Sequence, residues 1–324
     1  MASTTRQALL QALSAAEGAY ISGQQLAQQL GVSRAAVHKA AAALTAQGYA
    51  LEAASRRGYR LLGGDPFCTE AVGPYPAPVQ LYDTLESTNR TAKLLALEGA
   101  AHGTLVLAGG QTAGRGRLGR SFASPAGKGV YCSVVLRPPL PAANAQTATI
   151  GAAVAVCRAV QMLCGLELAI KWVNDLFLNG RKLCGILTEG GASLESGLLE
   201  QVVIGIGINI RHTKTAFPPE LCRRVTSIEE AVPDCHVKRA QLLSAVLCEL
   251  EQLLPDLSQR RFLREYRSRS CLTGRTVEIE MTDGNTKKAS VVGIADDCGL
   301  IIRNLNGDVE TLYAGDVHIR EMHV

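Results

Sequence analysis

A concentrated run of positive charge lies between Gln111 and Arg120, where three glycines alternate with three arginines as Gly-Arg-Gly-Arg-Leu-Gly-Arg. Glycine lets the backbone amides approach a ligand closely, and arginine carries a permanent charge with several donors. No Gly-Lys-Ser or Gly-Lys-Thr sequence is present, so the segment is neither a P-loop nor a dinucleotide fingerprint. It predicts a loop that binds a phosphate or carboxylate and becomes ordered when that anion binds. A flexible solvated loop is the alternative.

A second segment, Lys171-Trp172-Val173-Asn174-Asp175-Leu176, places a cation, an amide and a carboxylate within five positions. A lysine at the edge of an apolar strand can pair with a carboxylate or a phosphate, and Asp175 could bind a magnesium ion or accept a proton. The alternative is a surface Lys–Asp pair at the end of a strand.

A third segment contains Gly205, Gly207 and Asn209 and follows the apolar residues 202–204. Glycines on one side of a buried strand leave room for another group against the backbone, and the Asn209 amide offers donors and an acceptor to the edge of a heterocycle. A β-bulge in a packed sheet is the alternative.

The elements that must position these groups alternate between short strands and long helices. Such an order predicts an α/β or α+β domain built on one main sheet. We expect strands at residues 79–82, 104–108, 130–137, 183–187 and 201–210, and helices at 88–97, 144–164, 237–254 and 258–268. Four further β-like runs (276–281, 287–295, 300–304 and 308–314) are separated by turn sequences and predict a small closed barrel.

The first 62 residues contain six basic and two acidic residues, so their net charge of +4 equals that of the whole chain. Helical spacing predicts helices at 5–16, from Ser22 to Leu30 and from Ser33 to about 47, followed by two short strands around residues 54–58. This is a helix-turn-helix with a basic wing, which indicates DNA binding. A helical docking module is the alternative. The expected DNA-binding residues are Ser33, Arg34, His38, Lys39, Arg56 and Arg57.

Composition excludes several other classes of protein. With 324 residues, 47% of them hydrophobic, the chain is long enough for two or three folded domains. No uncharged apolar stretch approaches the roughly 18 residues needed to cross a bilayer, and the first residues are polar and then helical without a signal-peptide core, so we expect a cytoplasmic protein without membrane contact. The ten cysteines are irregularly spaced and the histidines form no metal-binding pair, so we expect reduced thiols and no metal site.

Five motifs in this order resemble the biotin protein ligase family. They are Glu86-Ser-Thr-Asn89, the Arg-Gly segment, Lys171-Trp-Val-Asn-Asp-Leu176, Lys182-Leu-Cys-Gly-Ile-Leu187 and Gly205-Ile-Gly-Ile-Asn209. With the N-terminal module, the chain resembles the bifunctional form of the family, which also represses biotin genes. The resemblance implies an α+β protein with three domains: a winged helix-turn-helix at 1–64, a mixed-sheet ligase domain of the class II synthetase-like type at 65–270, and an SH3-like barrel at 271–324.

The resemblance also implies a two-step reaction. Biotin and ATP, with Mg²⁺ and no tightly bound prosthetic group, give biotinyl-5′-AMP, and a lysine of a biotin carboxyl carrier protein then takes the biotinyl group. The biotin-binding residues would be Ser87, Thr88, Asn89, Gln111, Gly114, Arg115, Gly116, Arg117, Lys171 and Gly185. The adenylate-binding residues would be Arg117, Arg120, Phe122, Lys171, Asn174 and Asn209, and the catalytic residues Lys171, Arg115, Arg117 and Asp175.

The sequence departs from the family pattern at two positions. Leu118 stands where a further basic residue can occur, and Phe122 stands where a tryptophan can occur, so the charge and stacking surface of the loop are smaller. We expect the adenylate to act also as corepressor, promoting a homodimer that binds operator DNA. Two alternatives stay open: a regulator that senses biotin without catalysis, and a ligase for a related carboxylate such as lipoate.

Overall fold

The computed structural model describes residues 5–46, 48–138, 141, 144–192, 199–211, 217, 219–281 and 285–319. It comprises two compact units. The first contains the chain up to residue 73 together with 238–241, and the second contains 74–237 and 242–324.

The first unit begins with three helices, α1 (Thr5–Ala15), α2 (Gly23–Leu30) and α3 (Arg34–Ala46). Ser22 and Gln25 form a reciprocal capping box at the start of α2, and Gly31 ends that helix with a φ of 64°. An antiparallel hairpin of β1 (Tyr49–Ala54) and β2 (Gly58–Gly64) follows, and then the short helix α4 (Thr69–Val72). The predicted helix-turn-helix with a two-stranded wing is therefore confirmed. Its buried core contains Leu9, Leu13, Leu26, Val37 and Leu44.

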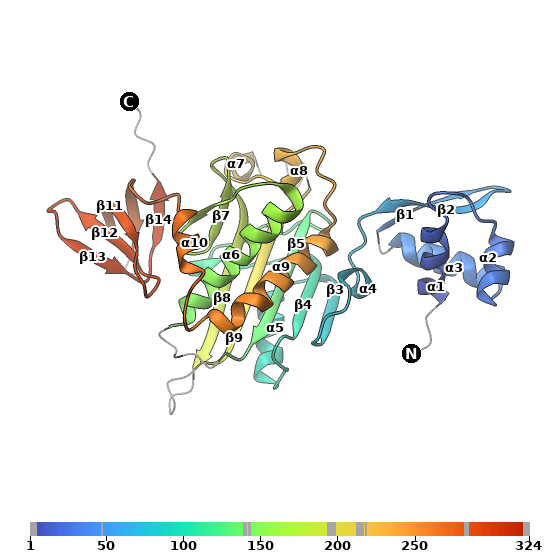
Figure 1. The fold of residues 1–324 in the computed structure, drawn as a ribbon, viewed down its shortest axis with the longest axis horizontal. Helices are drawn as coiled ribbons and strands as arrows, with labels where there is room; N and C mark the ends of the chain where they lie inside the picture. The colour runs from blue at the N-terminus through green and yellow to red at the C-terminus, as the bar shows by residue number, and fades with distance from the viewer. Residues whose placement is uncertain are drawn as a thin grey trace. The chain divides into compact units, whose positions relative to one another are not determined.

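A seven-stranded sheet forms the centre of the second unit (Figure 1). Its strand order is β3-β4-β5-β9-β8-β7-β6. Only β3 and β4 are parallel, and all other neighbours are antiparallel, so the predicted mixed sheet is confirmed. The strands are β3 (Val79–Leu85), β4 (Leu105–Gln111), β5 (Gly129–Leu136), β6 (Ala169–Lys171), β7 (Asp175–Leu178), β8 (Arg181–Ala192) and β9 (Leu199–Asn209).

Helices cover both faces of this sheet. Helix α5 (Thr88–Leu97) packs on the face that carries Val203 and Gly205, and α6 (Ala145–Cys164) packs on the other, where Thr149 bonds to Thr188. The remaining helices are α7 (Pro219–Cys222), α8 (Ile228–Ala231), α9 (Arg239–Leu253) and α10 (Leu263–Ser268). The helix predicted at 258–268 begins only at Leu263, because Arg260 adopts a φ of 56° that no α-helix contains.

Among the described helices, α6 alone is long and apolar enough to cross a bilayer. However, 72% of its most apolar window is buried, so α6 is the core helix of the unit. Within the described residues, no disulfide bond joins any two of the ten cysteines. Burial raises the pKa of the Cys132 and Cys157 thiols to about 12, which keeps both in the neutral form.

The last five strands form an antiparallel sheet in the order β13-β12-β11-β10-β14. Its core contains Val277, Ile279, Leu300 and Ile302. The predicted small β domain is confirmed, and within the described residues no pairing joins β13 to β14. Its strands are β10 (Thr276–Glu280), β11 (Thr286–Ile294), β12 (Leu300–Asn304), β13 (Val309–Leu312) and β14 (Asp316–Ile319).

Candidate functional site

A cavity of about 820 Å³ opens in the second unit, on the face of the central sheet that carries α5. Its walls come from the start of α5, the Arg-Gly segment, strands β6 to β9 and the turn before β14. Most of the residues singled out in the sequence line this one space. They are Ser87, Thr88, Asn89, Gln111, Arg115, Gly116, Arg117, Arg120, Phe122, Lys171, Asn174, Asp175 and Gly185.

Two of the singled-out residues do not line the cavity. Gly114 lies behind it, where a Cβ atom would overlap the backbone carbonyl of Phe122. Asn209 ends β9 and is 3% exposed, and no hydrogen bond to its Oδ1 is found within the described residues. Both therefore lie outside the wall that a ligand in this cavity would touch.

Cations gather at the end of the cavity next to the C-terminal sheet. Arg120 forms ion pairs with Asp316 and, at 3.3 Å, with Glu280. Lys171 Nζ lies 3.7 Å from Asp316 Oδ1, and His318 Nε2 lies 3.3 Å from the same carboxylate. Burial raises the pKa of Asp316, but the charges of Lys171, Arg120 and His318 outweigh it, so its pKa is lowered and it stays ionised.

Arg117 lies deeper than the other loop arginines. Its Nη1 donates to Asn174 Oδ1 at 3.4 Å, and Asn174 Nδ2 donates to the carbonyl oxygen of Ile186 at 2.7 Å. Burial lowers the pKa of Arg117, although the nearby Asp175 opposes this change. Asp175 forms a 2.6 Å ion pair with Lys182. The cavity therefore offers fixed cations to a ligand that carries more than one negative charge.

The ring of Phe122 lies against the sheet where two strands have glycine. A Cβ atom on Gly207 would overlap the ring, and one on Gly185 would lie 2.9 Å from it. Lys182 Nζ lies 5.8 Å from the ring centroid. The expectation that glycines in the third segment leave room for another group is confirmed: the Phe122 ring lies against Gly207, and the Asn89 amide lies against Gly205. The ring gives the cavity a flat apolar surface.

The end of the cavity at Ser87, Thr88 and Gln111 is lined by polar groups that carry no charge. Ser87 caps α5, and Gln111 Oε1 accepts a 2.8 Å hydrogen bond from the backbone N–H of Thr88. Gln111 Nε2 donates to Ser124 Oγ at 2.7 Å. Buried, well-bonded polar groups of this kind select a neutral polar group by the positions of its donors and acceptors.

Sequence reasoning missed several residues of the site. Lys182 was part of a motif but was given no role, and Glu280, Asp316 and His318 come from a domain for which no site was predicted. Glu280, Asp316 and His318 have ligand atoms within 4.8 Å of one another, a spacing that suits a metal ion. Arg120 already pairs with both carboxylates, so their charge is compensated without one.

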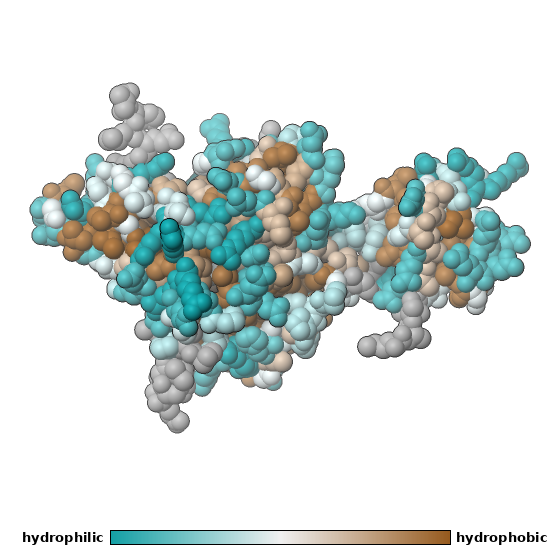
Figure 2. Space-filling view, viewed as in Figure 1, coloured by the Kyte–Doolittle hydropathy of each residue, from teal (hydrophilic) through white to brown (hydrophobic). Residues whose placement is uncertain are grey.

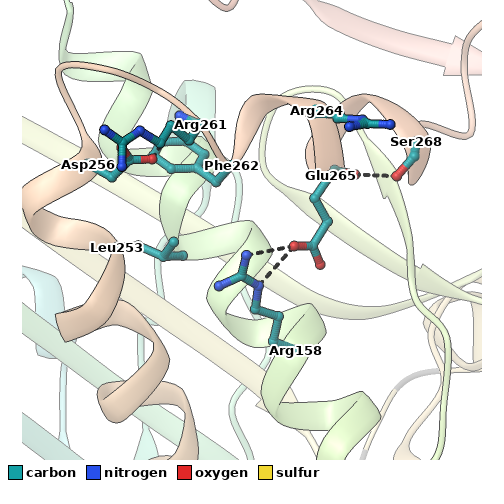
Figure 3. A pocket seen from close by; sticks show the side chains of 8 residues that line it. All are labelled: Arg158, Leu253, Asp256, Arg261, Phe262, Arg264, Glu265 and Ser268. Carbon is teal, nitrogen blue, oxygen red and sulfur yellow. Dashed lines mark hydrogen bonds and ion pairs between the residues drawn. The ribbon is translucent and has the colours of Figure 1, made fainter.

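A second cavity, of about 400 Å³, lies between α6, α9 and α10. Figure 3 shows the Glu265 carboxylate pointing to Arg158 across it, and their ion pair measures 2.9 Å. Glu249 also pairs with Arg158, and Asp256 pairs with Arg261. These ion pairs connect helices and leave little free charge for chemistry.

In the first unit, the expected DNA-binding side chains are all exposed. Arg34, His38 and Lys39 lie at the start of α3, and the Ser33 hydroxyl caps that helix by accepting a hydrogen bond from Ala36 N. Figure 2 shows hydrophilic residues at the tip of the β1–β2 hairpin, where Arg56 and Arg57 lie. The Arg57 guanidinium stacks on Tyr20, 4.0 Å from the ring centroid. The first unit therefore presents exposed basic residues at the start of α3 and at the tip of the hairpin.

Three family models match successive parts of the chain. Residues 5–60 match a model described as HTH domain, 81–209 match the Biotin/lipoate A/B protein ligase family, and 273–320 match the Biotin protein ligase C terminal domain.

Similar proteins align over most of the chain. The bifunctional ligase/repressor BirA of Bacillus subtilis is 35% identical over 98% of this chain and 100% of its own length. The biotin–[acetyl-CoA-carboxylase] ligase of Mycobacterium tuberculosis is 33% identical over 72% of this chain and 86% of its own. The fold resembles that of the Aquifex aeolicus biotin protein ligase solved with biotin and ATP, with a TM-score of 0.63, 24% identity, and coverage of 75% of this chain and 99% of that one. The chain therefore belongs to the biotin protein ligase family, in its bifunctional ligase and repressor form.

Proposed function

We propose that this chain joins biotin to a carrier protein at the expense of ATP and represses transcription when its product accumulates. One observation carries the proposal: a single cavity joins a polar, uncharged end at Thr88 and Gln111 to a cationic end at Lys171 and Arg120. Biotin has the same division, with a polar ring system at one end and a carboxylate at the other.

In the first step the biotin carboxylate attacks the α-phosphate of ATP, an acyl–phosphate bond forms and pyrophosphate leaves. Two anions must meet, so the barrier contains charge repulsion and lost orientational freedom. We assign Lys171 to the carboxylate and α-phosphate, Arg115 and Gly116 to the new mixed anhydride, and Arg117 and Arg120 to the nucleotide phosphates. A donor aimed at developing charge contributes about 2.7–4 kcal/mol.

The remaining adenylate contacts follow from the same cavity. We assign the Phe122 ring to the adenine face and Asn174 to the adenylate. Asn209, which the sequence analysis expected to bind the adenylate, does not line the cavity and receives no ligand contact in this proposal. Asp175 and Asp316 are the acidic residues that line the cavity, and their carboxylate oxygens would be the protein ligands for a magnesium ion that arrives with ATP. When bound, that ion would neutralise phosphate charge.

In the second step a carrier lysine attacks the mixed anhydride, an amide bond forms and AMP leaves. The amine has an ordinary pKa of about 10.4, so it must lose a proton before attack. Asp175 is the carboxylate that we assign to receive it, and its 2.6 Å ion pair with Lys182 holds it in place.

The regulatory half of the proposal rests on the exposed basic residues of the first unit and on the repressor relatives. We propose three domains, at residues 1–64, 65–270 and 271–324. We also propose that the protein is cytoplasmic, that it binds operator DNA, and that the adenylate promotes its homodimer. A dimer would present two α3 helices to two half-sites of a palindrome.

The ligase function is tested by incubating the purified chain with ATP, Mg²⁺, a biotin carboxyl carrier domain and either biotin or lipoate. We expect the carrier to gain the mass of one biotinyl group and no lipoyl group. An unmodified carrier would leave the sensing regulator as the better interpretation. Gel-shift titration with and without biotin and ATP tests the repressor, and equal DNA affinity in both conditions would reject the coupling.

A further inference from the structure

We propose that Ser133 and Glu189 fix the direction of the hydrogen bonds at the polar end of the cavity, so that Thr88 Oγ1 must accept a hydrogen bond from a ureido N–H of the ligand. This inference rests on the proposed biotin ligase function and adds the residues that determine its specificity. Neither Ser133 nor Glu189 lines the cavity. They act through Asn89, the second residue of α5.

The Asn89 amide spans three strands of the central sheet. Gly205 of β9 pairs with Ser133 of β5 on one side and with Leu187 of β8 on the other. Asn89 Nδ2 donates to the carbonyl oxygen of Leu187 at 3.1 Å and to Glu189 Oε2 at 3.0 Å, and Asn89 Oδ1 lies 2.7 Å from Ser133 Oγ. A Cβ atom on Gly205 would overlap the amide, so the glycine makes this position possible.

The chemistry of the two acceptors sets the orientation of the amide. A carbonyl oxygen and a carboxylate can only accept, so the Asn89 NH₂ group must face them and its oxygen must face Ser133. Burial raises the pKa of Glu189, but hydrogen bonds from Lys93 and Asn89 and the charges of Lys93 and Arg115 outweigh it, so its pKa is lowered. Lys93 Nζ lies 2.8 Å from the other carboxylate oxygen. Glu189 therefore remains an acceptor at neutral pH.

This orientation of the amide fixes the acceptor for the hydroxyl proton of Ser133 and for that of Thr88. Asn89 Oδ1 can only accept, so Ser133, which is fully buried, must donate its single proton to it. Ser133 Oγ also lies 2.8 Å from Thr88 Oγ1, and it has only lone pairs left for that contact. The Thr88 proton therefore points to Ser133. The competing acceptor, Gln111 Oε1, is 3.2 Å away and already accepts from the Thr88 N–H.

The Thr88 hydroxyl, whose proton is used by Ser133, therefore offers only lone pairs to the cavity. Ser87 Oγ accepts from the Arg90 backbone N–H, so its own proton remains available to the ligand. A cyclic urea places an N–H donor beside a carbonyl acceptor, which matches an accepting Thr88 and a donating Ser87. The dithiolane ring of lipoate has no N–H group, so it would leave the Thr88 lone pairs buried without a partner.

The first test measures biotin binding to Ser133→Ala by calorimetry. Without the Ser133 hydroxyl, the Thr88 proton is free to turn toward Gln111 or the cavity, and we expect about tenfold weaker binding. The KM for biotin should rise by the same factor while kcat for adenylate formation stays within twofold. Thr104→Val is the matched control, because it removes another buried hydroxyl, 2% exposed, outside the cavity, and it should bind biotin within twofold of the parent.

A double-mutant cycle tests whether Ser133 acts through Thr88. In a Thr88→Val background, Ser133→Ala should cost less than twofold in biotin affinity, since no hydroxyl remains to be oriented. A loss that stays tenfold there would overturn the proposal, as would parent-like binding by Ser133→Ala in the normal background. Glu189→Gln provides a second variant should Ser133→Ala fail to fold, and it should bind biotin more weakly than the parent; parent-like binding by a folded Glu189→Gln would then count against the proposal. A parent protein that binds no biotin would instead refute the proposed function itself.

Discussion

The ammonium group of Lys171 lies 3.7 Å from the carboxylate of Asp316, a residue of the last described strand. The same carboxylate pairs with Arg120 of the Arg-Gly segment. Asp316 therefore stands between two cations that the proposed reaction assigns to a carboxylate and a phosphate. The C-terminal domain thus takes part in the electrostatics of the cavity.

Asp316→Asn should make the second unit less stable than the parent at pH 7. This loss of stability should be smaller at low pH. The pKa of Asp316 is lowered in the folded state, so its contribution is full above the unfolded value of about 3.9 and is lost as the pH falls through the folded value. A loss of about 1 kcal/mol corresponds to roughly 2–4 °C in Tm. In thermal melts, the Tm difference between the parent and Asp316→Asn should shrink as the pH falls below about 4, whereas Asp83→Asn, which changes an exposed carboxylate outside the cluster, should match the parent. A difference as large at pH 3 as at pH 7 would contradict this interpretation.

Arg117→Met should slow adenylate formation by about 10² to 10³-fold, because it removes a buried cation that Asn174 holds in position. Pyrophosphate release at saturating biotin and ATP measures the effect. Arg264→Met removes an equally charged but exposed side chain from the second cavity and should leave the rate within twofold. A loss of less than threefold for Arg117→Met would show that this arginine does not meet the transition state.

Gly207→Ala should weaken ATP binding about tenfold, because the new methyl group occupies the place of the Phe122 ring and displaces the surface assigned to adenine. Biotin binding without nucleotide should change much less, since the polar end of the cavity is untouched. Calorimetry with each ligand separates the two effects. Gly293→Ala, which has no neighbour within 4 Å of the new methyl group, is the control. Equal losses for both ligands would indicate general damage to the sheet.

Arg34→Ala and Lys39→Ala should each weaken DNA binding and reduce its dependence on salt. A cation that contacts one phosphate contributes about 0.9 to the slope of log K against log salt, so each variant should lose about that amount. Fluorescence anisotropy at several salt concentrations gives the slope. Arg303→Ala, which removes an exposed cation from the C-terminal sheet, should keep the parent slope. An unchanged slope for both helix variants would show that DNA contacts a different surface of the protein.

Much of the fold could be predicted because its signals are local. Ser22 and Gly31 mark the ends of α2 by their capping chemistry, and the spacing of Leu9, Leu13 and Val37 marks the faces that pack together. The strands that the sequence analysis missed are short or lack a sustained alternation of polar and apolar residues. Strand β6 has three residues, and β14 follows Gly315 at the end of the chain.

The site was predictable where residues close in sequence share one loop, as in the Arg-Gly segment. It was not predictable where the partner lies far along the chain. Nothing near Asp316 indicates that its strand returns beside Lys171, and nothing near Glu189 indicates that its carboxylate fixes the Asn89 amide. Such contacts depend on strand order and register, which no local pattern encodes.

The indole N–H of Trp172 donates a 3.0 Å hydrogen bond to the carbonyl oxygen of Cys298, in the turn between β11 and β12. Trp172 is 3% exposed and directly follows Lys171. A chain that stopped after the central sheet would therefore expose a large aromatic surface beside Lys171, the residue that the proposed reaction assigns to the biotin carboxylate.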